Sequence, residues 1–424
     1  MQILLLGSGG REHAFAYKLA ESKHCTHLFI APGNPGTAAL GTNVAIAVTD
    51  FAAIKEFVLQ NKIELVVVGP EIPLVEGIYD YFVNDEALKQ IPVFGPSKMG
   101  AQLEGSKASS KAFMLRHSIP TASYAEFTAV NIQDGLAYIA KHTTPVVLKA
   151  DGLAAGKGVL ICSTAEEAQT EFKEMLGGKF GDASAKVVVE EFMDGIEFSV
   201  FVLTDGFEYK ILPTAKDYKR IGEGDTGLNT GGMGAVSPPA FVTENLMRIT
   251  EETIIKPTIA GLHKDKIIYK GIVYIGLMYL KTGELKVVEY NCRMGDPETE
   301  AVFPRIKSDL VEMILSTMRG KLATVQLEID ERAATTIILA SGGYPETFEK
   351  DKLVSGIENV KEAVVLHCGT KLDAAGKLRT NGGRVFAVTA LHANWKEALR
   401  LSNINAERIQ FENKYFRRDI GFDL

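Results

Sequence analysis

One short segment of the chain combines a carboxylate, an amide and a guanidinium at a spacing suited to metal and anion binding. Glu289, Asn291 and Arg293 occupy alternate positions at the end of an apolar run. Because strand side chains alternate between faces, we expect these three on one face and Val288 and Tyr290 on the other. Carboxylate and amide oxygens suit Mg²⁺ held together with nucleotide phosphates, and a guanidinium can bind a carboxylate through two hydrogen bonds. The alternative is the exposed polar face of an edge strand.

Carboxylates also gather in two other short segments. Asp296 belongs to a tight acidic turn directly after Arg293, while Glu190 and Glu191 end a β-branched run that is followed by Glu197. A glutamate at the end of an apolar strand needs a partner, and the amino group of adenine and the hydroxyls of ribose are such partners. A solvated acidic turn explains the second segment equally well.

A glycine-rich loop, Asp151–Gly158, follows an apolar strand pattern that ends at Lys149. It is not a Walker A loop, because only three residues separate Gly152 from Gly156 and Gly158 stands where Ser or Thr would bind magnesium. We expect a mobile flap whose backbone amides close over a polyphosphate, with Lys149 supplying a positive charge. The alternative is a flexible surface hairpin.

Three further polar turns follow strand patterns near the N-terminus. Gly7–His13 opens a helix, where glycines and the helix N-terminus favour an anion and Arg11 can add a charged contact. It is not a dinucleotide fingerprint, because Glu12 replaces the third glycine. With Pro32–Thr37 and Gly69–Glu71 at the same sheet edge, the turns predict a pocket for a phosphate and sugar hydroxyls. The alternative for the first is a tight turn without a ligand.

These candidate residues need a sheet to hold them. In the first hundred residues, short apolar runs alternate with segments whose apolar residues recur every three or four positions. This alternation predicts a doubly wound parallel sheet, whose ligand lies beyond the carboxyl ends of the strands. The predicted strands are Ile3–Leu6, Leu28–Ile30, Leu65–Val68 and Val93–Phe94, and the predicted helices are Glu12–Ala20, Phe51–Leu59 and Leu74–Phe82.

The remainder of the chain predicts more α/β structure around one long loop. Residues 123–191 have the pattern strand, helix, strand pair, helix, strand. The glycine-rich polar segment Pro213–Pro239 is expected to be a functional loop. The other predicted elements are a helix-rich stretch over Lys98–His117, strands Phe198–Leu203 and Tyr209–Leu212, the hairpin Gly271–Leu280 and Glu284–Tyr290, a helix around Leu310–Met318, and strands Thr335–Ala340 and Val385–Thr389.

The composition is that of a globular protein with more than one domain. The chain has 424 residues, of which 46% are hydrophobic and 23% are charged. This length exceeds what one hydrophobic core supports. Its 46 Lys and Arg against 53 Asp and Glu give a net charge of −7, so we expect neither nucleic acid nor a membrane as a partner.

The four cysteines are far apart and form no C-x-x-C pair, which favours reduced thiols in the cytoplasm over a disulfide framework or a zinc site. The N-terminus lacks the basic region of a signal peptide. We expect a cytoplasmic protein with a single activity, as a monomer or weak dimer.

Taken in order, the motifs resemble the phosphoribosylamine–glycine ligase family of the ATP-grasp superfamily. The resemblance covers essentially the whole chain, and Arg293–Glu298 is its most specific part. Each glycine-rich loop alone is a weak signal, whereas the ordered set is specific. The matching segments are Gly7–His13, Gly33–Thr37, Lys149–Gly158, Asn229–Gly234, Asn291–Glu298 and Thr380–Val385.

The resemblance implies ATP between two lobes, with Mg²⁺ or Mn²⁺ held by Glu289 and Asn291. The residues implied for ATP are Lys107, Lys149, Gly156, Lys157, Gly158, Arg220 and Asn229 at the phosphates, Glu190, Glu191, Phe192 and Met193 at the adenine, and Glu197 at the ribose.

The resemblance also implies glycine and 5-phosphoribosylamine as substrates. Arg293 and Asp217 are the candidates for the glycine carboxylate and ammonium, and with Lys149 they are the catalytic candidates. The residues expected to bind the substrates, besides Arg293 and Asp217, are Gly9, Gly10, Arg11, Gly33, Asn34, Gly36, Thr37, Glu71 and Asp296.

The implied fold is an N-terminal doubly wound parallel sheet, a central two-lobed ATP-grasp fold and a small C-terminal α/β domain. We expect the domains at residues 1–104, 105–327 and 328–424, with a small mobile lobe at about 121–190. The implied reaction transfers the γ-phosphoryl group of ATP to glycine, after which the amine of phosphoribosylamine displaces phosphate and gives glycinamide ribonucleotide. Positioning and charge neutralisation carry most of such a reaction.

Three alternatives remain at this point. Another ATP-grasp ligase would act on a different carboxylate or amine. A nicotinamide dehydrogenase is disfavoured by the missing third glycine. A non-catalytic nucleotide sensor would bind ATP without turnover, and the set Glu289, Asn291 and Arg293 argues against it.

Overall fold

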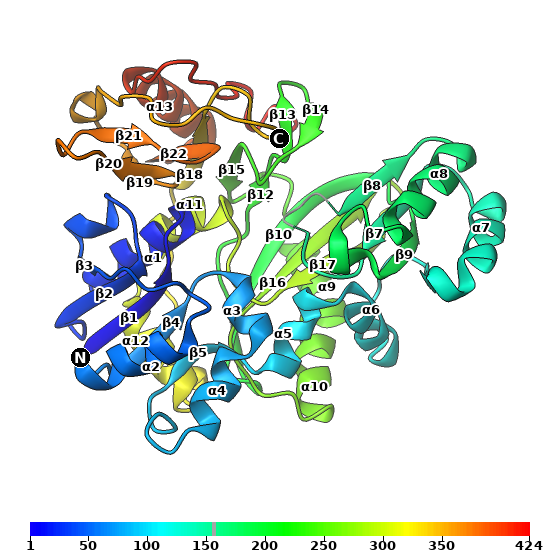
Figure 1. Cartoon of the computed structure of the whole chain (residues 1–424), viewed down its shortest axis with the longest axis horizontal. Coiled ribbons are helices and arrows are strands. Elements are labelled where there is room, and N and C mark those ends of the chain that lie inside the picture. The colour runs from blue at the N-terminus through cyan, green and yellow to red at the C-terminus, as the bar shows by residue number, and fades with distance from the viewer. Residues whose placement is uncertain (155–157) are drawn as a thin grey trace.

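The computed structural model describes residues 1–154 and 158–424. Its N-terminal part is a parallel sheet with β1 between β2 and β4, and with β3 and β5 outside them. The predicted doubly wound parallel sheet is therefore confirmed (Figure 1). The strands are β1 (Gln2–Gly7), β2 (His27–Pro32), β3 (Thr42–Asn43), β4 (Leu65–Val68) and β5 (Val93–Pro96), and the helices that accompany them include α1 (Gly10–Ala20), α2 (Phe51–Gln60), α5 (Lys98–Gly105) and α6 (Lys107–Arg116).

One predicted helix is divided in two. The spacing over residues 74–82 predicted a single helix, but α3 (Glu71–Glu76) and α4 (Ile78–Asn84) meet at Gly77. Gly77 has a φ of +97°, a left-handed conformation that glycine adopts readily and that ends an α-helix. The apolar spacing continues across the break because both helices bury side chains in the same core.

Strand β16 joins the N-terminal sheet to the rest of the molecule. β16 (Tyr269–Leu280) pairs antiparallel with β5 at its start, and with β10 (Gly195–Thr204) and β17 (Leu285–Asn291) along its length. β11 (Tyr209–Ile211) extends the sheet beyond β10. The continuous order is β11-β10-β16-β5-β4-β1-β2-β3, and the predicted β16–β17 hairpin is confirmed.

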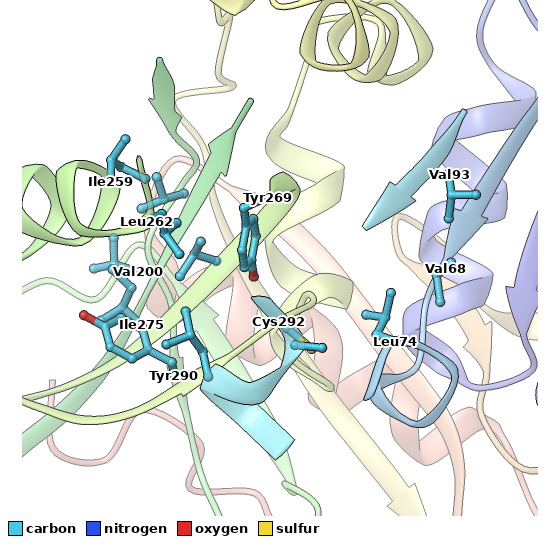
Figure 2. Close-up of a cluster of buried hydrophobic side chains, with 14 of the residues drawn as sticks. Val68, Leu74, Val93, Val200, Ile259, Leu262, Tyr269, Ile275, Tyr290 and Cys292 are labelled. Carbon is cyan, nitrogen blue, oxygen red and sulfur yellow. The ribbon is translucent and has the colours of Figure 1, made fainter. Parts of the chain in front are cut away.

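One apolar core follows this continuous sheet. Figure 2 shows side chains from α10 (Lys256–Lys264), β10, β16 and β17 on one side, and from β4, α3 and β5 on the other. Tyr269 and Cys292 lie between the two groups. The two parts of the sheet are therefore held together by shared packing as well as by backbone pairing.

The alternation predicted for β17 is interrupted by a bulge. Glu289 pairs with Gly276, while Val287 pairs with Leu277, so Val288 is an extra residue in the strand. Val287, rather than Val288, therefore packs in the same core as Tyr290, and the expectation for Val288 was wrong. A bulge of this kind inserts one residue and shifts the alternation that follows it.

A separate four-stranded sheet forms the small lobe that projects to the right in Figure 1. Its order is β6-β9-β7-β8, and the predicted sequence of strand, helix, strand pair, helix and strand is confirmed. The lobe has its own apolar core. Its elements are β6 (Tyr124–Thr128), α7 (Ile132–Lys141), β7 (Val146–Ala150), β8 (Val159–Cys162), α8 (Ala165–Leu176) and β9 (Lys186–Glu191).

The sequence predicted one long loop over Pro213–Pro239, and this prediction was wrong. The segment contains β12 (Lys216–Asp217), β13 (Arg220–Gly222), β14 (Thr226–Asn229) and β15 (Gly234–Ser237). β13 and β14 form a hairpin, whereas β15 pairs with β18 of the C-terminal part. These strands are too short to show an alternating pattern of apolar residues. In addition, β15 pairs with β18, which lies about a hundred residues later in the sequence.

The C-terminal part completes an antiparallel sheet of order β12-β15-β18-β22-β19, against which α13 packs.

In the described parts of the chain, no helix has the length and apolar character needed to cross a membrane. The remaining elements are α9 (Glu244–Thr250), α11 (Glu298–Val302), α12 (Leu310–Met318), β18 (Ala333–Ala340), β19 (Val364–His367), β20 (Thr370–Leu372), β21 (Leu378–Thr380), β22 (Arg384–His392) and α13 (Trp395–Arg408).

Candidate active site

Glu289 lies at the centre of the candidate site. Its cross-strand partner is Gly276, and Asn291 pairs with Tyr274, so both side chains project from the face opposite the core residue Tyr290. Burial alone would raise the pKa of the Glu289 carboxyl, but nearby positive charges lower it below its usual value. These charges belong to Lys219, Lys149, Lys107 and Arg293. The carboxylate is therefore ionised at neutral pH.

The donors on this face suit a hard divalent cation. Glu289 supplies an ionised carboxylate, and Asn291, which is 8% exposed, supplies an amide oxygen. Within residues 1–154 and 158–424, no cluster of three or more His, Cys, Asp or Glu side chains could hold a metal ion by itself. Mg²⁺ commonly takes one or two protein ligands and completes its shell with phosphates and water, so this donor set fits.

Lys149 is buried at the end of β7 beside Glu190. Its Nζ lies 3.0 Å from Glu190 Oε2 and donates to the backbone oxygen of Val288 at 3.2 Å. Lys111 Nζ lies 3.2 Å from the same glutamate oxygen, and burial, opposed by Glu190, lowers the pKa of Lys111 to about 8. Glu190 Oε1 is buried and has no hydrogen-bond partner among the described residues. An unpaired buried acceptor is costly, so this oxygen marks a position for a donor.

The three residues that follow Glu190 differ in their surroundings. The Glu191 carboxylate accepts a hydrogen bond from Ser123 N at 3.0 Å and pairs with Lys286 Nζ at 2.7 Å. Phe192 is 39% exposed, whereas Met193 is buried. The Glu191 side chain is therefore committed to the protein, and Met193 supplies an apolar surface.

The first residue of the glycine-rich loop, Asp151, is hydrogen-bonded to the start of helix α6. Asp151 Oδ1 accepts a hydrogen bond from Ala108 N at 2.8 Å, and its backbone oxygen accepts one from Lys107 N at 3.1 Å. Lys107 Nζ donates to the backbone oxygen of Gly152 at 3.4 Å. Burial lowers the pKa of Lys107, although Glu289 opposes this effect. Gly156 and Lys157, predicted to contact phosphates, lie outside the described residues; Gly158 follows them immediately before β8.

Lys219 links two of the predicted residues. Its Nζ contacts Glu197 Oε1 and lies 3.9 Å from Asp217 Oδ2. Burial, opposed by Lys219 and reinforced by Glu298 and Glu197, raises the pKa of Asp217 to about 7. Asp217 can therefore exchange a proton near neutral pH, while Glu197 is already paired with a cation.

Arg220 and Asn229 face each other across the β13–β14 hairpin. Arg220 Nη1 donates to the backbone oxygen of Gly227 at 2.7 Å, and Asn229 is exposed. The structure thus brings together two residues that are separated in sequence and were assigned to the phosphates.

Arg293 lies in a bend just after β17 and is held by two carboxylates. Its Nη2 pairs with Glu104 Oε1 at 2.6 Å, and its Nε with Glu71 Oε2 at 3.3 Å. Arg11 Nη1 lies 3.8 Å from the same Glu71 oxygen, and both arginines donate to the backbone oxygen of Met294 at 3.2 Å. A guanidinium has five N–H donors, so two N–H groups of Arg293 remain beyond these three contacts with described residues.

The turn after β2 is tied into the protein by its own side chains. The Asn34 amide donates to the backbone oxygens of Ser8 and His367 at 2.8 and 2.9 Å, and its oxygen accepts from the backbone N–H groups of Gly36 and Thr37. Thr37 Oγ1 donates to the backbone oxygen of Asn34 at 2.9 Å. The side chains of Asn34 and Thr37 therefore shape the turn that begins at Gly33.

Glu12 shapes the first turn in a similar way. Its Oε2 accepts a hydrogen bond from Gly9 N at 2.7 Å, and its Oε1 pairs with Arg11 Nε at 2.6 Å. A Cβ atom at Gly7 would lie 2.2 Å from Glu12 Cγ, and one at Gly69 would lie 2.3 Å from Glu12 Oε1. The glycines after β1 and β4 therefore make room for a buried carboxylate.

Asp296 lies where the N-terminal and C-terminal parts meet. Its Oδ1 is 3.0 Å from Arg384 Nη2, and a Cβ atom on Gly9 would lie 3.5 Å from its Oδ2. Glu300 is fully buried nearby, with neither carboxylate oxygen hydrogen-bonded to another described residue. Burial and the Asp296 charge raise the pKa of Glu300 well above its usual value. A Cβ atom at Gly10 would lie 2.3 Å from Glu300 Oε1.

Several residues of the site were not predicted as such from the sequence. They are Lys111, Lys219, Glu104, Glu300 and Arg384. Lys219 alternates with Asp217 in the sequence, and this spacing could have identified it. Arg384 lies within the matching segment Thr380–Val385, although no role was assigned to it. Glu300 lies four residues after Asp296, just beyond the matching segment that ends at Glu298. Lys111 and Glu104 have no local signal, because each meets its partner from a distant element.

Comparison with known proteins places all three parts of the chain in one family. Family models described as the N domain, the ATP-grasp (A) domain and the C domain of phosphoribosylglycinamide synthetase match residues 1–104, 105–299 and 334–423. Phosphoribosylamine–glycine ligases from Yersinia pestis and Escherichia coli O157:H7 are 45% and 46% identical over 427 residues, covering 100% of this chain and 98% of each relative.

Solved structures agree with this result. The crystal structure of phosphoribosylamine–glycine ligase from Thermotoga maritima superposes with a TM-score of 0.84 and 34% identity, covering 99% of this chain and 100% of the other. Biotin carboxylase from Campylobacter jejuni, solved as a β-γ-ATP complex, has a TM-score of 0.74 at 13% identity, with 99% and 94% coverage, which establishes a shared ATP-grasp fold only. The chain belongs to the phosphoribosylglycinamide synthetase family.

Proposed function

We propose that this chain ligates glycine to 5-phosphoribosylamine with hydrolysis of ATP to ADP and phosphate, giving glycinamide ribonucleotide. The observation that carries the proposal is the concentration of cations around Glu289, which suits a polyphosphate and a metal ion. The full-length similarity to phosphoribosylamine–glycine ligases supports the choice of substrates.

We assign ATP to the space between the small lobe and the β16–β17 face. Lys107, Lys149, Arg220 and Asn229 would contact the phosphates, and Glu190 Oε1 is available to the adenine amino group because it has no other partner among the described residues. Met193 would pack against the base. Glu289 and Asn291 would hold Mg²⁺ or Mn²⁺, which neutralises phosphate charge and polarises the transferred group when bound.

Glycine would lie between Arg293 and Asp217. Two free N–H groups of Arg293 can hold the carboxylate, while Asp217 faces the ammonium group, whose positive charge favours the ionised aspartate. The pairing of Arg293 with Glu104 and Glu71 fixes the guanidinium plane. This arrangement orients one carboxylate oxygen of glycine toward the γ-phosphate.

The acceptor amine would be held by the turns at the carboxyl edge of the N-terminal sheet. The helix α1 N-terminus at Gly9 and Gly10, with Arg11, suits a phosphate, and the backbone of Gly33 and Gly36, with Glu71 and Asp296, borders the same edge. Asp296 Oδ1 lies 3.0 Å from Arg384 Nη2, and Oδ2 lies toward Gly9.

We propose that the reaction passes through glycyl phosphate. A glycine oxygen attacks the γ-phosphorus, the bond to the β-γ bridging oxygen breaks, and ADP leaves. The amine of phosphoribosylamine then attacks the acyl carbon, the acyl–oxygen bond breaks, and phosphate leaves while the amine loses a proton. Positioning and cationic stabilisation supply most of the acceleration in such transfers, and exclusion of water by the glycine-rich loop protects the acyl phosphate.

We further propose domains at residues 1–104, 105–327 and 328–424, with the small lobe at about 121–190. The separate four-stranded sheet and separate core of that lobe support its independent movement. The protein is proposed to act in the cytoplasm on small molecules alone, as a monomer or weak dimer.

One assay tests the proposed function. ADP release is measured with ATP and Mg²⁺ while glycine and phosphoribosylamine are each supplied or withheld. We expect release to depend on both substrates and glycinamide ribonucleotide to form in equal amount. Release with another carboxylate or amine, but not with this pair, would identify a different ATP-grasp ligase, and nucleotide binding without release would identify a sensor.

A further inference from the structure

The last residues of the chain lie against the strands that enter the candidate active site. After α13, residues 415–423 run along β12 and the β13–β14 hairpin, and Figure 1 shows the C-terminus beside these strands. Arg220 and Asn229 are on the hairpin, and Asp217 is on β12. The end of the chain therefore contacts the elements that present three of the proposed active-site residues.

Arg417 is the centre of this contact and is fully buried. Its Nε and Nη2 donate to Asp419 Oδ1 and Oδ2 at 2.9 and 2.8 Å. Its Nη1 donates to Asp225 Oδ1 at 2.6 Å and to the backbone oxygen of Arg220 at 3.1 Å. One guanidinium thus joins the tail to both the turn and the first strand of the hairpin.

Further hydrogen bonds connect the same two segments. Gly224 N donates to Asp419 Oδ2 at 2.7 Å, and Arg418 N donates to Glu223 Oε1 at 3.1 Å. The Tyr415 hydroxyl donates to the backbone oxygen of Ile221 at 2.8 Å. A two-stranded hairpin is only marginally stable by itself, so these contacts from the tail hold it in place.

The side chains from Lys216 to Lys219 alternate between the tail and the active site. Lys216 Nζ lies 3.2 Å from Asp423 Oδ2, and the Tyr218 hydroxyl donates to Asp423 Oδ1 at 2.8 Å. The residues between and after them, Asp217 and Lys219, face the active site instead, where Lys219 contacts Glu197. One extended segment therefore has the tail on one side and the proposed glycine and nucleotide sites on the other.

We propose that Arg417 is a positioning residue, which holds the β13–β14 hairpin and through it sets Arg220 and Asn229 against the nucleotide phosphates. The proposal rests on the proposed function for its kinetic consequence, but not for its structural one. Arg417 does not touch substrate in this scheme. Its charge is paired by Asp419 and Asp225, so an exchange at Asp225 weakens the link to the hairpin while Asp419 still pairs the guanidinium.

The sharpest variant is Asp225→Asn. Asp225 has a φ of +54°, a conformation that asparagine also tolerates well, so the exchange removes one charge and leaves the backbone undisturbed. Asp419 remains to pair with Arg417, and the variant should fold. Arg417→Met is the stronger change, with Arg417→Lys as the conservative variant. Arg379→Met is the matched control, because Arg379 pairs with Asp373 at 2.6 Å in the same part of the chain and contacts no described residue of the hairpin.

The direct measurement is hydrogen exchange of the peptide that contains residues 220–229 in the full-length protein. We expect faster exchange there in Asp225→Asn and Arg417→Met, a smaller increase in Arg417→Lys, and no increase in Arg379→Met. In steady-state assays we expect the KM for ATP to rise about 10-fold or more, while the KM for phosphoribosylamine changes by less than about twofold, because its proposed site is on other elements.

The two measurements distinguish the possible failures. Unchanged hydrogen exchange over residues 220–229 in both Asp225→Asn and Arg417→Met would overturn the proposal. KM values for ATP in these two variants that match the value in the Arg379→Met control would also overturn it. If the hairpin loosens but the wild-type protein does not ligate glycine, the proposed function fails and the positioning of the hairpin stands.

Discussion

At the scale of single residues, the site is defined by buried and half-buried charges that balance one another incompletely. Lys149 and Lys111 share one oxygen of Glu190, and Lys219 is shared by Glu197 and Asp217. Lys107, by contrast, donates only to a backbone oxygen through its side chain, among the described residues. Buried charges require partners, so a polyanion together with its metal ion would complete the balance.

Glu289→Ala tests the proposed metal ligand. We expect turnover to fall by about 10²–10³-fold, as is typical for the loss of one electrostatic stabiliser, and the Mg²⁺ requirement to shift to higher concentration. Glu284→Ala is the matched control, because Glu284 is an exposed residue near the turn of the same hairpin. Turnover near the wild-type level at saturating Mg²⁺ would remove Glu289 from the metal site.

Arg293→Ala tests the glycine site. A charged hydrogen bond contributes about 1.5–3 kcal/mol, so we expect the KM for glycine to rise by about 10–100-fold. The variant also leaves Glu104 and Glu71 without their cation, and breaking a buried pair typically costs about 3–5 kcal/mol of stability. Thermal unfolding measured beside the kinetics separates the two effects. A destabilised enzyme with an unchanged glycine dependence would show that Arg293 only holds the two carboxylates.

At the scale of elements, the ends of β1, β2 and β4 form the proposed acceptor edge, and side chains from neighbouring segments shape their turns. Glu12 occupies the space left by two glycines, and Asn34 joins the turn after β2 to the backbone at Ser8 and His367. The shape of this edge therefore depends on contacts between turns more than on any one glycine.

Gly7→Ala tests this view. Gly7 has a φ of +126°, and a Cβ atom there would overlap Glu12 Cγ. Gly283 provides the control, because it has a φ of +87° and a Cβ atom added to it would meet no described atom within 4 Å. Both alanine variants carry backbone strain of about 1–3 kcal/mol, so the additional loss of unfolding free energy in Gly7→Ala measures the overlap. Equal losses in urea denaturation would show that Glu12 moves aside freely.

The elements that could be predicted from the sequence are those with long, regular patterns. β16, β17, α1 and the small lobe follow directly from apolar spacing. The helix break at Gly77 and the bulge at Val288 were missed because each depends on a single residue. The pattern of apolar residues before and after that residue stays regular, so the sequence gives no sign of the irregularity. β12 to β15 were missed because they are short and their partners are distant. The family motifs identified Glu289 and Asn291 as candidate metal ligands, and that role stays a prediction. The partners of Arg293 could be seen only in the assembled fold.

At the scale of the whole molecule, Glu300 lies where α11 meets α1 and the C-terminal sheet. Gly10 approaches it from α1, and Cys368, Asp296 and Arg384 face it from the surrounding segments. Burial and the charge of Asp296 raise the pKa of its carboxyl well above the usual value, against the opposing charge of Arg384. A buried carboxyl whose pKa is raised in the folded protein couples the stability of this junction to pH.

Glu300→Gln tests this coupling. A raised folded-state pKa means that the native protein binds a proton that the unfolded chain releases, so Glu300 costs stability progressively as pH rises above about 4.3, the ordinary pKa of glutamate. Glutamine keeps a donor for Asp296 and does not titrate. We therefore expect Glu300→Gln to have nearly wild-type unfolding free energy near pH 4 and to become the more stable protein as pH increases. Glu358→Gln, at an exposed position, is the control; a constant difference across pH would contradict the prediction.

The passage of β16 through both halves of the main sheet has a mechanical consequence. Its pairing with β5 at one end and with β10 and β17 along its length places the acceptor turns and the face of Glu289 on a single rigid frame. In the proposed reaction, the gap between the attacking amine and the activated glycine is then fixed by backbone geometry. If the four-stranded lobe moves as proposed, nucleotide entry is gated without disturbing the alignment of the two groups to be joined.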